Sequence, residues 1–326
     1  MAFQLKVNES VGDGITRNVR RQIEKARAQL GAKRKPHRRG APGNEAVREV
    51  RKCFKRVRAA LRLVREDLGD DAYREENWCL RDAARPLTEV RDAEMLVESV
   101  DKLAQHLAEA IEPGAFAKIR EALLANQQEM TRRVLDKDRA FVAVGDAAAR
   151  ALARLPGWKV ERTGWVALES GLRHVYRAGH RALALALENS SVENLHEWRK
   201  QAKCLWLQLQ LLGAAWTRKE KKRIDQTHKL SRVLGEDHDL AVLRETLAAD
   251  PLAYGGHHIL KFVFTVIDRQ RKELEREALA LGRKVYKDSP TVFTSRIETY
   301  NTGSLGGYPK SATNRHAKPG HLTAGG

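Results

Sequence analysis

The stretch EAVREVRKCFK (Glu45–Lys55) recurs 148 residues later as ENLHEWRKQAK (Glu193–Lys203). Five positions are identical, and all five carry charged side chains. A second match, 147 residues apart, aligns Arg85, Leu87, Glu89, Asp92 and Leu96 with Arg232, Leu234, Glu236, Asp239 and Leu243. Unrelated amphipathic helices share apolar positions, but they rarely share charged ones at nearly one offset. The chain is therefore predicted to be an internal duplication, with halves of about 1–157 and 158–288 related by an approximate twofold axis.

The apolar residues around these stretches have helical spacing. Val47, Val50, Phe54 and Val57 recur at alternating steps of three and four, as in one long amphipathic helix. Further helices are predicted at about 15–30, 72–110 with a break near Pro86, 115–155, 165–189, 192–213, 218–249 and 256–287. No segment alternates like a strand, so the predicted fold class is all-α, built of two pseudo-symmetric antiparallel helical bundles within residues 1–288. Residues 289–326 lack a periodic apolar face and are predicted to form a disordered tail.

The composition favours an anionic partner. Lys and Arg number 60 against 42 Asp and Glu, a formal net charge of +18. Nucleic acid, an acidic membrane surface and a phosphate polymer would all suit such a surplus. No apolar run is long enough for a membrane span of ~18 residues. No signal-like segment begins the sequence, and the three cysteines form no Cys-x-x-Cys pair, so we expect a cytoplasmic protein without membrane contact.

Basic residues form a stripe beside the apolar seam of the first repeat. The stretch Asn44–Asp67 holds eight Lys or Arg against four acids. A solvated face with charge pairs four residues apart is the ordinary interpretation of such a stripe. The stripe is duplicated, however, and a stripe next to a core seam can line a groove between helices, so we expect it to bind an anion. Its members are Arg48, Arg51, Lys52, Lys55, Arg58 and Arg62, and in the second half His196, Arg199, Lys200 and Lys203.

At three aligned positions one half has Arg and the other His. The pairs are Arg48 with His196, Arg81 with His228, and Arg91 with His238. Arg and His share the ability to donate hydrogen bonds and to carry positive charge, which suits contact with an anion. Arg can neither ligate a metal nor shuttle a proton at neutral pH. No metal site and no cofactor are therefore expected, and no histidine pair has metal-binding spacing.

The stretches 193–203 and 229–243 (KLSRVLGEDHDLAVL) resemble the two signature segments of the CHAD family, the conserved histidine α-helical domain. The stretches 45–63 and 80–96 resemble its first half, and the resemblance spans roughly residues 10–287. It implies two helical bundles facing each other across a basic channel that binds inorganic polyphosphate. Two departures are visible: Arg48 stands where a first-half histidine is expected, and Trp206 and Leu207 replace a frequent basic-aromatic pair.

Carried over by position, the resemblance gives a set of phosphate contacts: Arg51, Lys52, Lys55, Arg58, Arg62, Arg91, His196, Arg199, Lys200, Lys203 and His238. The repeat and the basic helix near residue 175 add Arg48, Arg81, Arg85, Arg173, Arg177, His228 and Arg232. We expect His196 and His238 to bind better below about pH 6.5, where imidazole is protonated. Asp92 and Asp239 are expected to orient Arg91 and His238, or to cap the next helix, rather than to act as a catalytic pair.

Two other functions fit parts of the sequence. Weak, salt-dependent nucleic-acid binding follows from the net charge alone, although aromatic residues for base stacking are few. His196-Glu197 resembles the surroundings of a phosphoacceptor histidine, which would make the chain a phosphotransfer protein. The sequence lacks a P-loop and an acidic magnesium cluster, so a protein without enzymatic activity is expected. Association with polyphosphate granules is a further hypothesis, and the oligomeric state stays open.

Overall fold

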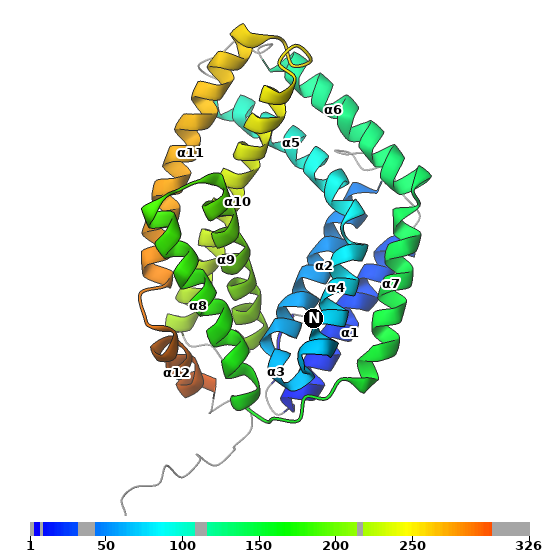
Figure 1. Cartoon of the computed structure of the whole chain (residues 1–326), viewed down its shortest axis with the longest axis vertical. Helices are drawn as coiled ribbons and strands as arrows, with labels where there is room; N and C mark the ends of the chain where they lie inside the picture. Colours follow the sequence, from blue (N-terminus) through cyan, green and yellow to red (C-terminus); the bar gives the residue numbers. More distant parts are fainter. Residues whose placement is uncertain (1–2, 7–8, 32–42, 108–115, 214–217, 302–326) are drawn as a thin grey trace, which may run out of the picture.

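The computed structural model describes residues 3–6, 9–31, 43–107, 116–213 and 218–301, and this part of the chain is helical without a strand. The all-α prediction is therefore confirmed. Figure 1 shows the first-half helices on one side and the second-half helices on the other. The first half holds α1 (Val11–Gly31), α2 (Asn44–Leu63), α3 (Arg65–Leu68), α4 (Asp70–Ala83), α5 (Pro86–His106), α6 (Ala117–Thr131) and α7 (Ala140–Arg154). The second half holds α8 (Val166–Glu188), α9 (Val192–Leu212), α10 (Arg218–Ala249), α11 (His257–Val285) and α12 (Pro290–Asn301).

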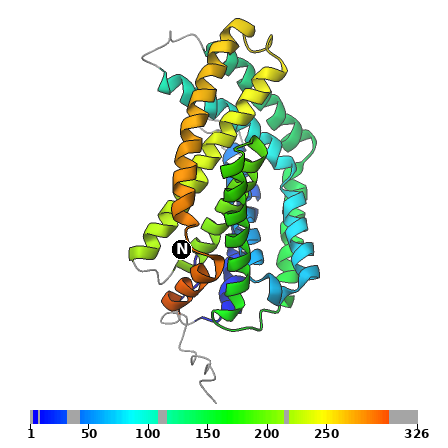
Figure 2. The same ribbon diagram turned by 60° about the vertical axis from the view of Figure 1, so that its left-hand side comes forward.

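The duplicated stretches lie on equivalent helices. The first repeat stands on α2 and α9, and the second on α5 and α10. In the first half a break before Pro86 separates α4 from α5, whereas α10 runs unbroken through 32 residues. Proline lacks the N–H that a helix interior needs, but it fits the first turn, so the predicted break near Pro86 is confirmed. Figure 2 shows the long α11 lying beside α10.

The apolar seam of α2 forms part of the core. Val47, Val50, Phe54, Val57 and Leu61 are at most 1% exposed. Each such side chain contributes about 1.5–3 kcal/mol on burial. The basic residues of α2 stand beside this seam rather than within it, which leaves them free to serve a site.

The two halves join along α2 and α9, and along α5 and α10. In the first contact Gln208 donates a hydrogen bond to the carbonyl oxygen of Ala59 at 3.3 Å. α8 also crosses α2 at Gly171, where an added Cβ would lie 2.1 Å from the carbonyl oxygen of Leu63. The backbone N–H of Leu5 donates to the carbonyl oxygen of Leu211 at 2.8 Å, so the N-terminal segment is bonded to the second half.

Two predictions of element boundaries are wrong. The helix predicted over 115–155 is divided: α6 continues as a π-helical turn over Arg132–Lys137, and Arg139, with a φ of 50°, separates this turn from α7. Part of the predicted disordered tail forms α12, whose Phe293 stacks on Tyr176 with ring centroids 3.8 Å apart. Among residues 290–298, the part of α12 whose burial is described, the buried apolar residues are Phe293 and Ile297, too few to give a periodic signal. Residues 302–326 and most of the basic run 31–43 lie outside the described residues.

No helix in the described part of the chain has the length and apolar character that a membrane span requires.

Candidate functional site

Basic side chains from both halves meet where α2 packs against α9. Arg51 and Lys55 project from α2, and their duplicated counterparts Arg199 and Lys203 project from α9. The charges on Arg51, Arg199 and Lys203 all act on Lys55, which places the four side chains in one region. We call these four residues the central cluster. The duplication thus puts the same two cations on each side of the contact between the halves.

The central cluster is crowded with like charge. The pKa of Lys55 falls to about 7, mainly because surrounding protein displaces bulk water and further because its three cationic neighbours repel its charge. The pKa of Lys203 falls to about 8 through burial and the charges of Arg199, Arg56 and Lys52. The Lys55 side chain is nevertheless exposed to water. The Lys55 amine is therefore within reach of a dissolved anion.

Two duplicated carboxylates face the central cluster. Asp92 on α5 and Asp239 on α10 both lie near Arg199 and Arg91, and desolvation raises the pKa of each. The expectation that they orient Arg91 and His238 is wrong, because these two side chains bond to other partners described below. The carboxylates instead offset part of the positive charge of the cluster.

His196 and His238 form a direct pair. Their Nδ1 atoms are 3.2 Å apart, so one ring donates and the other accepts. Burial lowers both pKa values, that of His238 to about 4, and the nearby charge of Arg199 lowers them further. Both rings are therefore neutral at neutral pH in the unbound protein. Burial thus shifts protonation of the two rings below the range near pH 6.5 that the sequence suggests, and stronger binding at low pH stays a prediction.

The equivalent pair in the first half carries its own counter-ions. Arg48 donates to Glu94 at 2.7 Å and lies 3.4 Å from Glu98. Arg91 donates to the same two carboxylates at 2.8 Å and 3.0 Å. Along α2 itself no acid lies in the middle turns of the basic stripe. Glu94 and Glu98 reach the stripe from α5, so the sequence of α2 alone does not reveal them.

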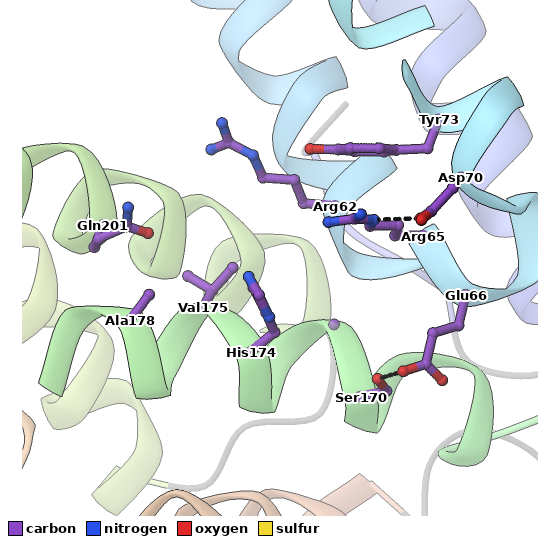
Figure 3. A pocket seen from close by; sticks show the side chains of 11 residues that line it. Arg62, Arg65, Glu66, Asp70, Tyr73, Ser170, His174, Val175, Ala178 and Gln201 are labelled. Carbon is purple, nitrogen blue, oxygen red and sulfur yellow. Dashed lines mark hydrogen bonds and ion pairs between the residues drawn. The ribbon is translucent and has the colours of Figure 1, made fainter. Parts of the chain in front are cut away.

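At its C-terminal end the stripe of α2 reaches a pocket of about 470 Å³ (Figure 3). Arg62, Tyr73, His174 and Gln201 contribute to its lining. The acids at the rim are engaged: Asp70 accepts from Arg65 at 2.9 Å and Glu66 from Ser170. Burial and the arginines around it, including Arg65, Arg177 and Arg62, lower the pKa of His174.

Sequence reasoning did not select Tyr73 or Gln201, since a neutral side chain carries no charge signal. Among the predicted residues near this end, Arg58 donates to Asn77 at 2.8 Å and Arg173 bonds to Glu169. Arg177 lines an adjoining pocket of about 480 Å³. Arg173 lines this second pocket as well, so Arg62, Arg173 and Arg177 all border pockets, whereas Arg58 is bonded to Asn77.

Most of the remaining predicted residues form salt bridges at the surface. Lys52 and Lys200 are exposed, and each bonds to the glutamate three residues before it. Arg81 and Arg85 are exposed and pair with Asp82, and Arg232 pairs with Glu236. These salt bridges at the surface contribute little, typically about 0–1 kcal/mol, so the arginines and lysines are easily released to an anion.

His228 is held by an aromatic contact. Its ring stacks on Trp206 with centroids 4.4 Å apart, and Lys203 Nζ lies 4.1 Å from the centroid of the same Trp206 ring. Trp206, which departs from the family pattern, therefore connects His228 to the central cluster.

Within the described ranges no group of three or more His, Cys, Asp or Glu side chains could hold a metal ion.

Comparisons with known proteins agree with the fold. A family model described as "CHAD domain" matches residues 21–248. The crystal structure of the CHAD domain from the plant Ricinus communis is 14% identical, covers 92% of this chain and 95% of its own, and has a TM-score of 0.54. PptA from Streptomyces chartreusis is also 14% identical, covers 86% and 98%, and has a TM-score of 0.57. No curated protein matches significantly.

Proposed function

The chain belongs to the CHAD domain family, and on that premise we propose that it binds inorganic polyphosphate in a basic channel between its two halves. The central cluster is the observation that supports this proposal most strongly. Four cations from two halves share one region, where burial and then the repulsion of the three neighbouring charges lower the pKa of Lys55 to about 7. Such crowding costs free energy in the free protein, and a bound polyanion removes that cost.

The mechanism is multivalent, charge-assisted hydrogen bonding. Arginine offers a planar fork of donors that matches phosphate oxygens, while lysine supplies a compact charge. From Arg51 to Arg62 the stripe on α2 rises about 16 Å, enough to follow several phosphates of an extended chain. A thin polymer without bases or sugars could enter the proposed channel between α2 and α9, where a nucleic-acid duplex could not.

We further propose that binding is the whole activity. No catalytic step is assigned to His196, whose Nδ1 is engaged by His238. Cytoplasmic location and association with polyphosphate granules stay predictions, as does weak nucleic-acid binding. The Trp206 ring already contacts both His228 and Lys203, which makes it a poor platform for a nucleobase.

The test is a titration of the whole chain with long-chain polyphosphate, single-stranded DNA and double-stranded DNA at equal phosphate concentration and near-physiological salt. We expect polyphosphate to bind at least about tenfold more tightly than either DNA, because only the thin phosphate chain fits the proposed channel. Equal affinities for the three polymers would favour nucleic-acid binding by diffuse charge. In a parallel incubation with ATP and Mg²⁺, acid-labile phosphate on His196 would contradict the assignment of a binding role alone.

A further inference from the structure

The duplication places two pairs of residues at equivalent positions and gives them opposite surroundings. Arg48 and Arg91 in the first half correspond to His196 and His238 in the second. The histidines contact each other and have no carboxylate bonded to their rings. The arginines instead form salt bridges with Glu94 and Glu98. The two halves of the basic stripe are therefore chemically different.

Glu94 and Glu98 occupy the donors that a phosphate would use. Each guanidinium contacts both carboxylates, at four N···O distances between 2.7 and 3.4 Å. A guanidinium recognises carboxylate and phosphate through the same fork of N–H groups. Residues four apart on a helix have Cβ atoms about 5–6 Å from each other, so the two carboxylates stand like neighbouring anionic groups of one ligand.

A phosphate chain would not easily displace these carboxylates. Glu94 is only 3% exposed, and its loss of both arginines would leave a buried charge without a partner. Among the described residues of the second half, no pair of carboxylates is bonded to His196 and His238 in this way. The duplication places Ala241 opposite Glu94, and Glu245, opposite Glu98, is exposed and forms no ion pair with a described residue.

We propose that Glu94 and Glu98 are specificity residues, built-in anions that withdraw Arg48 and Arg91 from the phosphate-binding stripe and end it in the first half. This inference rests on the proposed binding of polyphosphate. A bound chain then contacts the central cluster, Arg62 and the His196–His238 pair of the second half, and it makes no contact with Arg48 and Arg91 of the first half. The site is thus asymmetric although it is built from a duplication.

The test compares Glu98→Gln and the double variant Glu94→Gln/Glu98→Gln with the matched control Glu245→Gln. Dissociation constants for long-chain polyphosphate are measured over a salt series. Each arginine released to bind phosphate makes the slope of log affinity against log salt steeper by about 0.7, the value for single-stranded polyanions. We expect a steeper slope and about tenfold tighter binding at low salt for Glu98→Gln, a larger effect in the double variant, and no change for Glu245→Gln.

The outcomes separate the two proposals. If the unaltered protein does not bind polyphosphate, the proposed function fails, and this inference fails with it. If the unaltered protein binds but Glu98→Gln weakens binding, the acids position the arginines for phosphate and the inference alone is overturned. The inference is also overturned if the slope of log affinity against log salt is the same for Glu98→Gln as for Glu245→Gln. Thermal melting checks the fold, and Glu98, which is only half-buried, gives a variant that can be interpreted even if the double variant does not fold.

Discussion

Polyphosphate binding near pH 8 should be accompanied by uptake of protons from solution. In the free protein the pKa values are about 7 for Lys55 and about 8 for Lys203. At pH 8, therefore, Lys55 is about nine-tenths neutral and Lys203 about half neutral. A bound polyanion favours the charged form of both amines and raises their pKa values, so binding protonates them. The expected uptake is at most about 1.4 protons per site at pH 8 and close to zero at pH 6.

The sign of the pH dependence follows directly. Because the amines are charged in the complex and lose their protons in the free protein as pH rises through 7 to 8, affinity should fall with increasing pH. Solvent screening makes the full uptake an upper bound, since Lys55 is exposed to water. His196 and His238 contribute little at pH 8, as their pKa values are lowered in the free protein and that of His238 is about 4.

Isothermal titration calorimetry in two buffers of different ionisation enthalpy measures this uptake. Lys55→Met should remove most of it. Lys52→Met is the matched control, because Lys52 lies on the same helix, is exposed and pairs with Glu49. The control should weaken binding slightly and lower the proton count much less than Lys55→Met does, because the charge of Lys52 makes only a minor contribution to the low pKa of Lys203. Tight binding at pH 8 with no proton uptake would refute the reasoning that the pKa values of Lys55 and Lys203 are lowered in the free protein. Equal uptake by Lys55→Met and the unaltered protein would refute it for Lys55.

Three further changes test the site and the fold. Lys203→Glu should weaken polyphosphate binding by about 2 kcal/mol or more because it places an anion in the central cluster, whereas Lys272→Glu on the exposed face of α11 should change the titration little. Gly171→Leu should lower the free energy of unfolding by several kcal/mol, since its Cβ would meet the Leu63 carbonyl, while Gly157→Ala, with nothing within 4 Å, should stay within about 0.5 kcal/mol in denaturant titrations. Phe293→Ala should cost about 3 kcal/mol by removing the stack on Tyr176, and limited proteolysis should then cut within α12 first; equal protease resistance would show that α12 does not depend on this stack.

The sequence predicts much of the fold because its signals are local. Apolar spacing along α2 and the charged identities shared with α9 require only one helix at a time, and both could be recognised without a structure. The partners of the charged residues are not local. Arg48 has no acid within reach on the central turns of its own helix, and only the packing of α2 against α5 brings Glu94 to it.

The properties of the histidines were beyond sequence reasoning for a related reason. An imidazole in water has a pKa near 6.5, and that value gave the expected pH range. The 3.2 Å contact of His196 with His238, together with burial and the charge of Arg199, sets a lower one. The sequence could identify which residues are basic, but it could not tell which of them carry charge in the free protein.

The hydrogen bond from Leu5 to Leu211 has a consequence for the order of folding during synthesis. About 200 residues separate the two, so at roughly 5–20 residues per second a ribosome needs some 10–40 s to make the partner of this early segment. Leu5 is 1% exposed in the finished protein, and Arg17 and Asn18 of α1 already bond to the neighbouring carbonyl of Gln4. The side of its docking site that α9 supplies is absent until α9 emerges, so this segment can complete its contacts only after α9 of the second half has been made.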